Sequence, residues 1–352
     1  MEFGPLLDAA EQLVTNGTTP ACQVAVARDN EVVCFETFGA ATDATRFCVF
    51  SATKPIVASA VWLLIGDGLL DPARPVSHCV PEFATNGKEA ITVEQVMLHT
   101  SGFPNAPMDA IEGGDTVTRV KRFTEWQLEW EPGSRFEYHG TSAHWVLAEL
   151  IERCTGSDFR DFVDERVCTP NRLPRLLGLL EEEQEDIAEC VPLGERPDGA
   201  ATMAVDGSVF NDPAVRAAGI PGAGAVATAA TMARFYQALL HNPNGVWDAN
   251  VLRDATTNVR CTLPDPLMNV PANRSLGLVL AGDDGLHQLR YAFFGRDNSP
   301  GSFGHAGAFC QVAWADPATG ISFSFLKNGL QADMIADAVK VIPITDAAAA
   351  LH

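Results

Sequence analysis

The sequence predicts an α+β fold in which one sheet is assembled from the two ends of the chain and carries a large helical insertion. Strand-like runs occur near both termini, whereas the middle of the chain has the apolar periodicity of helices. A chain of 352 residues is long enough for one large domain or two interleaved subdomains with an ample core. We expect a sheet subdomain made of residues 1–66 and 275–345 and a mainly helical subdomain made of residues 67–274.

The N-terminal part of the chain predicts a helix, a hairpin and a buried helix. The first helix is amphipathic, and the two strands after it are separated by Asp29-Asn30, a frequent turn pair. The second helix contains the longest apolar run of the chain, which is too short to cross a bilayer and stops at Gly66-Asp67. The expected elements are a helix at about 5–16, strands at 21–28 and 31–37, and a helix at about 52–65.

The middle of the chain predicts helices, and strand character returns near the C-terminus. Helical periodicity alternates with Gly- and Pro-rich loops in the middle, and the last two strands are separated by the turn Pro317-Ala318-Thr319-Gly320. The expected elements are helices at 92–98, 115–128, 142–155 and 158–166, strands at 276–281, 308–316 and 320–327, and a last helix at about 331–341.

Composition disfavours several classes of function. A formal net charge of -21, with no basic run longer than Lys121-Arg122, argues against nucleic acid, and an anionic membrane surface would repel the chain. The N-terminal residues lack the basic and apolar regions of a secretory signal, so we expect a cytoplasmic protein. The nine cysteines include no C-x-x-C pair, which predicts reduced core thiols rather than disulfides or zinc ligands.

The tetrapeptide Ser51-Ala52-Thr53-Lys54 lies where a strand-like run ends and the buried helix begins. Serine and lysine three residues apart project from one face of a helix, so the lysine amine can reach the hydroxyl. Burial near a helix N-terminus lowers the pKa of a lysine, and the neutral amine can then activate the serine. The alternative is an ordinary exposed helix lysine. A second match, Ser324-Phe325-Leu326-Lys327, lies in a strand-like run, where residues three apart point to opposite faces.

Two further motifs follow Ser51-x-x-Lys54 along the chain. Tyr138-His139-Gly140 precedes a helix, and Gly304-His305-Ala306-Gly307-Ala308 leads into a strand. Together the three motifs resemble those of the serine β-lactamase and penicillin-binding-protein superfamily. The second motif begins with tyrosine, and in this it resembles one branch of the superfamily. That branch contains class C β-lactamases, family VIII carboxylesterases and related D-peptidases and acyltransferases. Supporting loops match as well, at residues 67–72, 97–104, 131–133 and 222–228.

The resemblance covers roughly residues 20–330 and implies a β-lactamase/transpeptidase-like fold, with an antiparallel sheet flanked by helices and the site between the two subdomains. It implies that Ser51 is the nucleophile, and that Lys54 and Tyr138 share the general-base and general-acid steps in an order that the sequence leaves open. It also implies an oxyanion hole formed by the backbone N–H groups of Ser51 and Ala308. The residues implied in substrate binding are His305, Gly307 and His139.

Other histidine and aromatic residues near these motifs are better explained by structural roles than by catalysis or metal binding. His99 lies in a loop that the family uses to brace the site, which disfavours a catalytic pair of His99 with Ser101. His139 and His144 do not have the spacing of a zinc site. No G-x-S-x-G occurs, which excludes the nucleophile elbow of the α/β-hydrolases. Three aromatic residues before the third motif are core residues by default but could line an acyl pocket: Tyr291, Phe293 and Phe294.

Two departures from the family pattern bear on the substrate. The second motif has Gly140 where many β-lactamases of this branch have an asparagine, whose amide helps to hold the acylamino group of the substrate. The third motif begins with His305 rather than a lysine, and a neutral histidine lacks the cation that lies near the substrate carboxylate. Both departures favour a neutral or weakly charged ester.

We therefore expect a serine hydrolase that cleaves a small carboxylic ester through an acyl-Ser51 intermediate, without a metal or an organic cofactor. Three alternatives use the same residues: β-lactam hydrolysis, cleavage of a D-amino-acid amide or peptide, and acyl transfer to an acceptor other than water. A fourth alternative is a non-catalytic scaffold of the same fold, against which the intact Ser51, Lys54 and Tyr138 weigh. The sequence leaves the acyl and alcohol parts of the substrate and the oligomeric state open.

Overall fold

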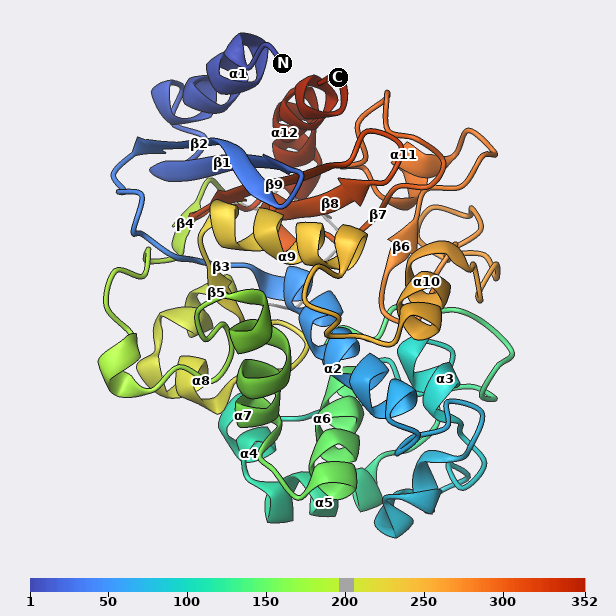
Figure 1. The fold of residues 1–352 in the computed structure, drawn as a ribbon. Helices are drawn as coiled ribbons and strands as arrows, with labels where there is room; N and C mark the ends of the chain where they lie inside the picture. The colour runs from blue at the N-terminus through green and yellow to red at the C-terminus, as the bar shows by residue number, and fades with distance from the viewer. Residues whose placement is uncertain (196–205, 352) are drawn as a thin grey trace.

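The computed structural model describes residues 1–195 and 206–351. At its centre is a six-stranded sheet with the order β2-β1-β9-β8-β7-β6, in which each neighbouring pair is antiparallel (Figure 1). The strands are β1 (Ala21–Arg28), β2 (Glu31–Gly39), β6 (Val279–Leu280), β7 (Phe303–Gly304), β8 (Val312–Asp316) and β9 (Ile321–Lys327). The N-terminal hairpin pairs with strands from the C-terminus, which confirms the expected α+β fold.

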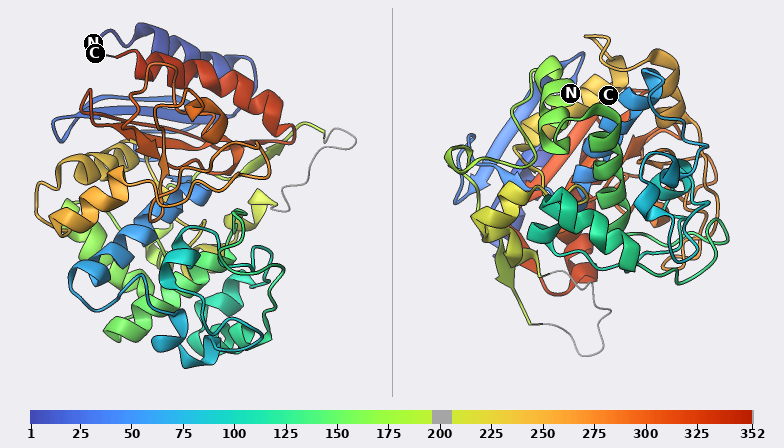
Figure 2. Two further views of the ribbon diagram at one scale, coloured as in Figure 1. Left: turned by 90° about the vertical axis from the view of Figure 1, so that its right-hand side faces the viewer. Right: turned by 90° about the horizontal axis from the view of Figure 1, so that it is seen from below.

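Side chains alternate between the two faces of the sheet, as the two-residue period of a strand requires. In β1, Val24 faces one hydrophobic cluster and Ala25 faces the other. Helices α1 (Gly4–Thr15) and α12 (Met334–Ala349) cover the first face and lie side by side, which brings the two ends of the chain together (Figure 2). Helix α9 (Ala229–His241) covers the second face.

Below α9 in Figure 1 lies the helical part of the molecule, built around α2 (Lys54–Gly66). Helix α2 is apolar on nearly all sides and buried over most of its length, and it packs against α6 (Ser142–Thr155). The other α-helices in the described residues are α3 (Val93–Met97), α4 (Ala110–Gly114), α5 (Thr116–Glu125), α7 (Phe159–Val163), α8 (Pro213–Ala218), α10 (Ala249–Thr257) and α11 (His287–Arg290). Two small sheets pair β3 (Phe47–Cys48) with β5 (Val226–Ala227) and β4 (Val191–Leu193) with β10 (Gly329–Gln331).

Three segments near the C-terminus differ from the sequence prediction. Of the strand expected at 276–281, only Val279–Leu280 joins the sheet. The expected strand at 308–316 begins only at Val312, because Phe309 and Cys310 have positive φ angles of 56° and 63° and form a turn. The last helix, expected at about 331–341, spans Met334–Ala349 instead. Its start follows Asp333, whose side chain accepts hydrogen bonds from backbone N–H groups of the first turn.

Two helices lie across the expected boundary between the subdomains. Helix α2 belongs mostly to the segment 1–66 that was expected with the sheet, yet it packs among the helices. Helix α9 belongs to the segment 67–274 that was expected to be the helical part, yet it packs on the sheet. Residues that position the site therefore come from both layers.

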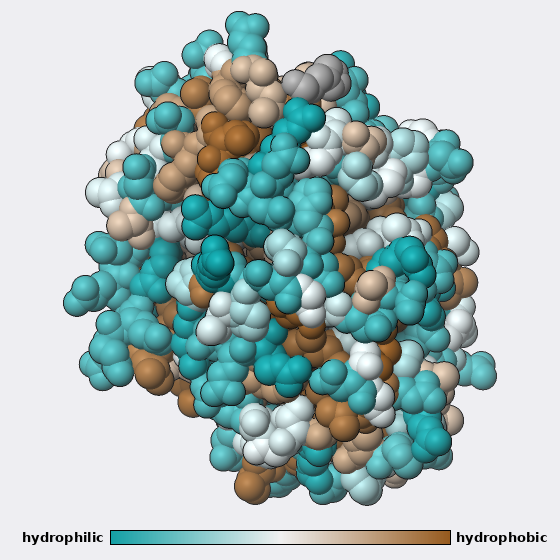
Figure 3. All heavy atoms as spheres, viewed as in Figure 1, coloured by the Kyte–Doolittle hydropathy of each residue, from teal (hydrophilic) through white to brown (hydrophobic). Residues whose placement is uncertain are grey.

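Hydrophilic residues cover most of the face seen in Figure 3, and hydrophobic residues show in smaller patches between them. In the described chain, no helix combines the length and the apolar character that crossing a bilayer requires. All nine cysteines have free thiols.

Candidate active site

Ser51 lies in a tight turn between the short strand β3 and the buried helix α2. The preceding Phe50 has a φ angle of 46°, which a bulky residue adopts only where the surrounding structure holds it. Two hydrogen bonds hold this turn against the loop before β5. The Val49 N–H donates to the Ala225 carbonyl over 3.0 Å, and the Ala225 N–H donates to Thr53 Oγ1 over 2.9 Å.

Lys54 is fully buried, and its amine lies 3.2 Å from the Ser51 hydroxyl. The amine also donates hydrogen bonds of 2.7 Å to the carbonyl oxygens of Gly140 and Gly222. Burial, with a smaller contribution from the charge of Arg274, lowers the pKa of Lys54 well below its usual value. A neutral amine has two N–H groups and one lone pair, so the two carbonyl oxygens can use both donors and leave the lone pair for the serine. The arrangement fits a base for Ser51.

Tyr138 comes from the loop that precedes α6 and lies against the lysine amine. Lys54 Nζ is 4.9 Å from the centre of the Tyr138 ring. The Tyr138 hydroxyl is buried and has no hydrogen-bond partner among the described residues. Burial raises the pKa of Tyr138 to about 12, although the neighbouring Ser51 hydroxyl and the charge of Arg274 act in the opposite direction. The phenol is therefore protonated at neutral pH.

The third motif approaches the nucleophile through a close backbone contact. A Cβ atom at Gly307 would lie 2.1 Å from the Val49 carbonyl oxygen, so only glycine fits there. This contact brings Ala308 to the turn that carries Ser51. The backbone N–H groups of Ser51 and Ala308 donate no hydrogen bond to other described residues, so both are available to a ligand oxygen.

His305 directly follows β7 and faces Tyr138. The centres of the two rings are 6.0 Å apart. His305 Nδ1 donates to the Ala306 carbonyl over 2.7 Å, whereas Nε2 is buried and without a partner in the described chain. Burial, with a smaller contribution from the charge of Arg274, lowers the pKa of His305 well below its usual value. The ring is therefore neutral at pH 7, as expected from the sequence.

His139 braces a loop instead of facing the substrate side of the site, which revises the expectation that it binds substrate. Its Nε2 lies 3.0 Å from Ser101 Oγ and accepts from the Phe103 N–H over 3.3 Å. Its Nδ1 donates to the Glu137 carbonyl over 2.6 Å. The His139 N–H donates to His99 Nδ1 over 3.2 Å, so His99 braces the same loop. Neighbouring residues of an extended loop point in different directions, and here Tyr138 takes the side of the lysine.

Two other sequence features are structural. The second Ser-x-x-Lys match does not form a pair, because the amine of Lys327 lies 2.8 Å from the carboxylate of Asp337 in α12, on the far side of the sheet from Ser51. The three aromatic residues before the third motif lie in the hydrophobic cluster beneath α1 and α12, so they are core residues and do not line an acyl pocket: Tyr291, Phe293 and Phe294.

Three contributors to the site were not predicted from the sequence. The carbonyl oxygens of Gly140 and Gly222 bind the lysine amine, and a carbonyl group leaves no signal in a sequence. The third contributor is Arg274, whose guanidinium carbon lies 5.5 Å from the centre of the Tyr138 ring. Its only signal in the sequence is a charged residue two positions before the apolar run at 276–281.

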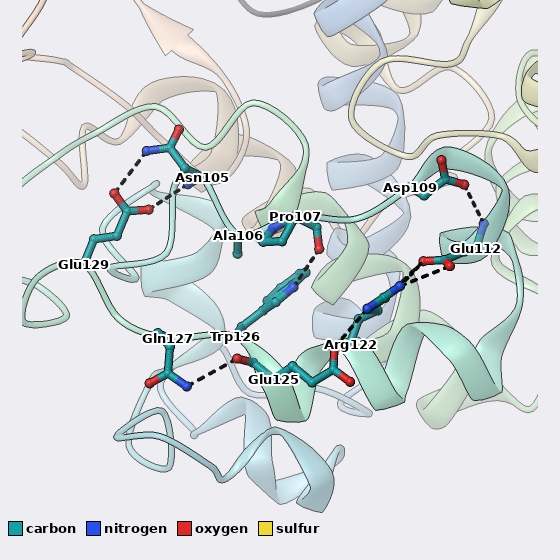
Figure 4. Close-up of a pocket in the computed structure, with 10 residues that line it drawn as sticks. All are labelled: Asn105, Ala106, Pro107, Asp109, Glu112, Arg122, Glu125, Trp126, Gln127 and Glu129. Carbon is teal, nitrogen blue, oxygen red and sulfur yellow. Dashed lines mark hydrogen bonds and ion pairs between the residues drawn. The ribbon is translucent and has the colours of Figure 1, made fainter.

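A cavity of about 520 Å³ lies elsewhere, beside α4 and α5 (Figure 4). Its walls are rich in acidic side chains, and within it Arg122 forms an ion pair with Glu112 at 2.8 Å. None of Ser51, Lys54 and Tyr138 lines this cavity, so we do not assign the reaction to it.

A sequence profile of the family described as Beta-lactamase matches residues 7–343. The chain belongs to the Beta-lactamase family. It is 26% identical over 317 residues to Esterase/beta-lactamase LipL of Mycobacterium tuberculosis, a match that covers 82% of this chain and 70% of LipL. Together, the family and this relative support a serine hydrolase of the esterase and β-lactamase type.

Solved structures show the same fold for this Beta-lactamase family member. A family VIII carboxylesterase superposes with a TM-score of 0.81 at 24% identity, covering 97% of this chain and 96% of that one. A penicillin-binding protein homologue from Caulobacter crescentus superposes with a TM-score of 0.80 at 24% identity, covering 98% of this chain and 96% of that one. These similarities establish the β-lactamase/transpeptidase-like architecture.

Proposed function

We propose that this Beta-lactamase family member cleaves a small carboxylic ester through an acyl-Ser51 intermediate. The observation that carries the proposal is the set of contacts made by the Lys54 amine. The carbonyl oxygens of Gly140 and Gly222, each 2.7 Å away, can take both N–H groups of a neutral amine. The lone pair then remains for the Ser51 hydroxyl at 3.2 Å. This geometry, with the protonated Tyr138, supports Lys54 as the first base.

In the first step, Ser51 Oγ attacks the ester carbonyl carbon while its proton moves to Lys54 Nζ. The negative charge that develops on the carbonyl oxygen is stabilised by the backbone N–H groups of Ser51 and Ala308. The tetrahedral intermediate collapses by breaking the bond to the alcohol oxygen. Tyr138 gives its proton to the departing alkoxide and regains one from the Lys54 ammonium.

In the second step, water attacks the acyl carbonyl carbon and gives a proton to the same pair of groups. The bond between the acyl carbon and Ser51 Oγ breaks, Ser51 regains its proton, and the carboxylic acid leaves. A different acceptor in place of water would give acyl transfer from the same intermediate.

One observation supports an ester over a β-lactam, and the names of the relatives are compatible with an ester. Position 140 offers no side-chain amide to an acylamino group, and a Cβ atom there would meet nothing within 4 Å. The relative LipL is named as an esterase as well as a β-lactamase, and the family VIII carboxylesterase has the same architecture. Hydrolysis of an amide would use the same residues and differs only in its poorer leaving group.

The test measures turnover of p-nitrophenyl butyrate, butyryl p-nitroanilide and nitrocefin by the purified protein and by a folded Ser51→Ala variant. We expect turnover of the ester, much slower turnover of the anilide and nitrocefin, and no turnover by the variant. Efficient nitrocefin turnover with negligible ester turnover would replace the ester with a β-lactam. A folded protein whose Ser51 fails to react with a fluorophosphonate would instead support a non-catalytic scaffold.

A further inference from the structure

Within the described part of the chain, one largely buried cation beside the proposed catalytic residues has no anionic partner. The guanidinium carbon of Arg274 lies 5.5 Å from the centre of the Tyr138 ring and 5.6 Å from the centre of the Phe136 ring. The residue is only 9% exposed. Among the described residues, the ion pairs involve other arginines or Lys327, and no side-chain or backbone oxygen accepts a hydrogen bond from the Arg274 guanidinium.

Arg119, another buried arginine of the described chain, shows how such a charge is normally compensated. Its guanidinium donates to the carboxylate of Glu149 over 2.8 Å and 3.0 Å and to the Gly113 carbonyl over 2.8 Å. It also forms an ion pair with Glu152. A largely buried charge without an anionic partner is costly, which makes Arg274 a candidate for a partner that arrives with a ligand.

Two acidic residues that could compensate Arg274 are engaged elsewhere. Asp265 influences Arg274 through its charge, but it lies outside ion-pair distance and its side chain accepts from the Leu267 N–H over 2.9 Å. Glu137, next to Tyr138 in the chain, pairs with Arg135 at 3.2 Å. The guanidinium therefore faces the site as an uncompensated positive charge.

The other basic groups of the site do not supply such a charge. Lys54 and His305 are both held neutral by burial, because their pKa values lie well below the usual ones. An arginine, in contrast, stays protonated when it is buried. The planar N–H donors of a guanidinium fit a carboxylate. The Arg274 guanidinium packs against the rings of Phe136 and Tyr138, which fix its position.

We propose that Arg274 binds a carboxylate of the substrate beside the scissile bond, so that the preferred substrates are esters that carry an anionic group. The inference rests on the proposed esterase function and names its substrate class. The unpartnered Tyr138 hydroxyl and His305 Nε2 lie next to the guanidinium side of the site and can contact the same ligand.

This substrate class revises the neutral ester favoured by the sequence. That expectation followed from Gly140 and from His305, which stands where the family commonly has a lysine. Arg274 returns a cation to the site from a different element, the segment in which Cys261 and Arg274 pair as a bridge ahead of β6. The location of the Arg274 charge in the site, as well as the charge itself, then determines which substrate binds.

The test uses two pairs of esters that differ in charge but hardly in shape. The first pair, 3-carboxyphenyl butyrate and 3-carbamoylphenyl butyrate, varies the leaving group. The second pair, the monophenyl ester of adipic acid and its terminal carboxamide, varies the acyl group. The readout is the ratio of kcat/KM values within a pair, because a change in the reactivity of Lys54 or Tyr138 affects both members alike.

We expect the carboxylate to be preferred in at least one pair by roughly tenfold to a hundredfold, the usual worth of a charge-assisted hydrogen bond. Arg274→Gln should abolish the preference, and Arg274→Lys should retain part of it. The matched control is Arg135→Gln, which removes a nearby exposed charge and should leave the ratio unchanged. A wild-type ratio near one in both pairs, or an equal loss in the Arg135→Gln control, would overturn the proposal.

Binding separates this inference from the proposed ester chemistry. If no ester is hydrolysed, calorimetric binding of 3-carboxyphenylboronic acid is compared with that of 3-carbamoylphenylboronic acid, using the wild type and Arg274→Lys and Arg274→Gln variants. Tighter binding of the carboxylate that is lost in Arg274→Gln supports an anion site even when the esterase proposal has failed. Equal binding of the two compounds by the wild type overturns it.

Discussion

The rings of Phe50 and Phe309 lie against each other, with centres 5.2 Å apart and planes inclined at 60°. Both residues have positive φ angles, 46° and 56°. Each adjoins one N–H group of the proposed oxyanion hole, since Ser51 follows Phe50 and Ala308 precedes Phe309. The ring contact therefore joins the two halves of the oxyanion hole, and packing offsets the roughly 1–3 kcal/mol that each strained backbone costs.

Removing one ring of this pair should slow the reaction. We expect Phe309→Ala to lower kcat/KM for p-nitrophenyl butyrate by roughly tenfold to a hundredfold, because an oxyanion donor that shifts by about 1 Å loses much of its effect. Phe210→Ala is the control, since the Phe210 ring also lies 5.2 Å from that of Phe50 but adjoins no oxyanion donor. It should lower the free energy of unfolding by roughly 3–5 kcal/mol and spare kcat/KM. Equal losses of activity in the two variants would contradict this account.

Gly307→Ala should remove activity without unfolding the protein. The added Cβ atom would lie 2.1 Å from the Val49 carbonyl oxygen, so the third motif must move away from Ser51. We expect a loss of kcat/KM of roughly a hundredfold or more, the effect of losing one oxyanion donor. Gly4→Ala is a control at a site where a Cβ atom meets nothing within 4 Å. Wild-type kinetics in a folded Gly307→Ala protein would show that the close approach does not matter.

Much of the fold and part of the site could be predicted because the responsible signals are local. The spacing of Ser51 and Lys54 at the start of a buried helix fixes their proximity, whatever the rest of the chain does. Arg274 and His139 depend instead on the paths of loops, which no periodic pattern encodes. The turn at Phe309 likewise arises from a tertiary contact, which overrides the strand character of its own sequence.

Lys54→Met should abolish acylation and change how stability depends on pH. The folded protein keeps the amine neutral, so between the lowered folded pKa and the usual 10.5 the unfolded chain binds a proton that the folded chain does not. The wild type therefore gains stability as the pH rises through this interval, by at most about 1.4 kcal/mol per pH unit. The variant lacks this gain.

Urea unfolding of both proteins between pH 7 and pH 10 measures the effect. The difference in unfolding free energy should shift in favour of the wild type as the pH rises. Parallel curves would mean that Lys54 is charged in the folded protein, and the role of first base would then be lost.

Acid should destabilise the loop that His139 braces. Burial lowers the pKa of His139 from 6.5 to about 4, against the opposing effect of its bond to the Glu137 carbonyl. The unfolded chain takes up a proton first as the pH falls, so this stability is present above pH 6.5 and is lost towards pH 4. In His139→Asn we expect a lower Tm at pH 7 but a shallower fall over that window. Identical slopes in thermal unfolding would refute this assignment.

The central claim is that Ser51 carries the acyl group during turnover. The most direct measurement is the mass of the Ser51 peptide after the reaction with p-nitrophenyl butyrate is quenched rapidly in acid. The account predicts a butyryl group on Ser51 in the wild type and no butyryl group on that peptide in the Ser51→Ala and Lys54→Met proteins. A butyryl group on another residue, or full ester turnover by Ser51→Ala, would contradict it.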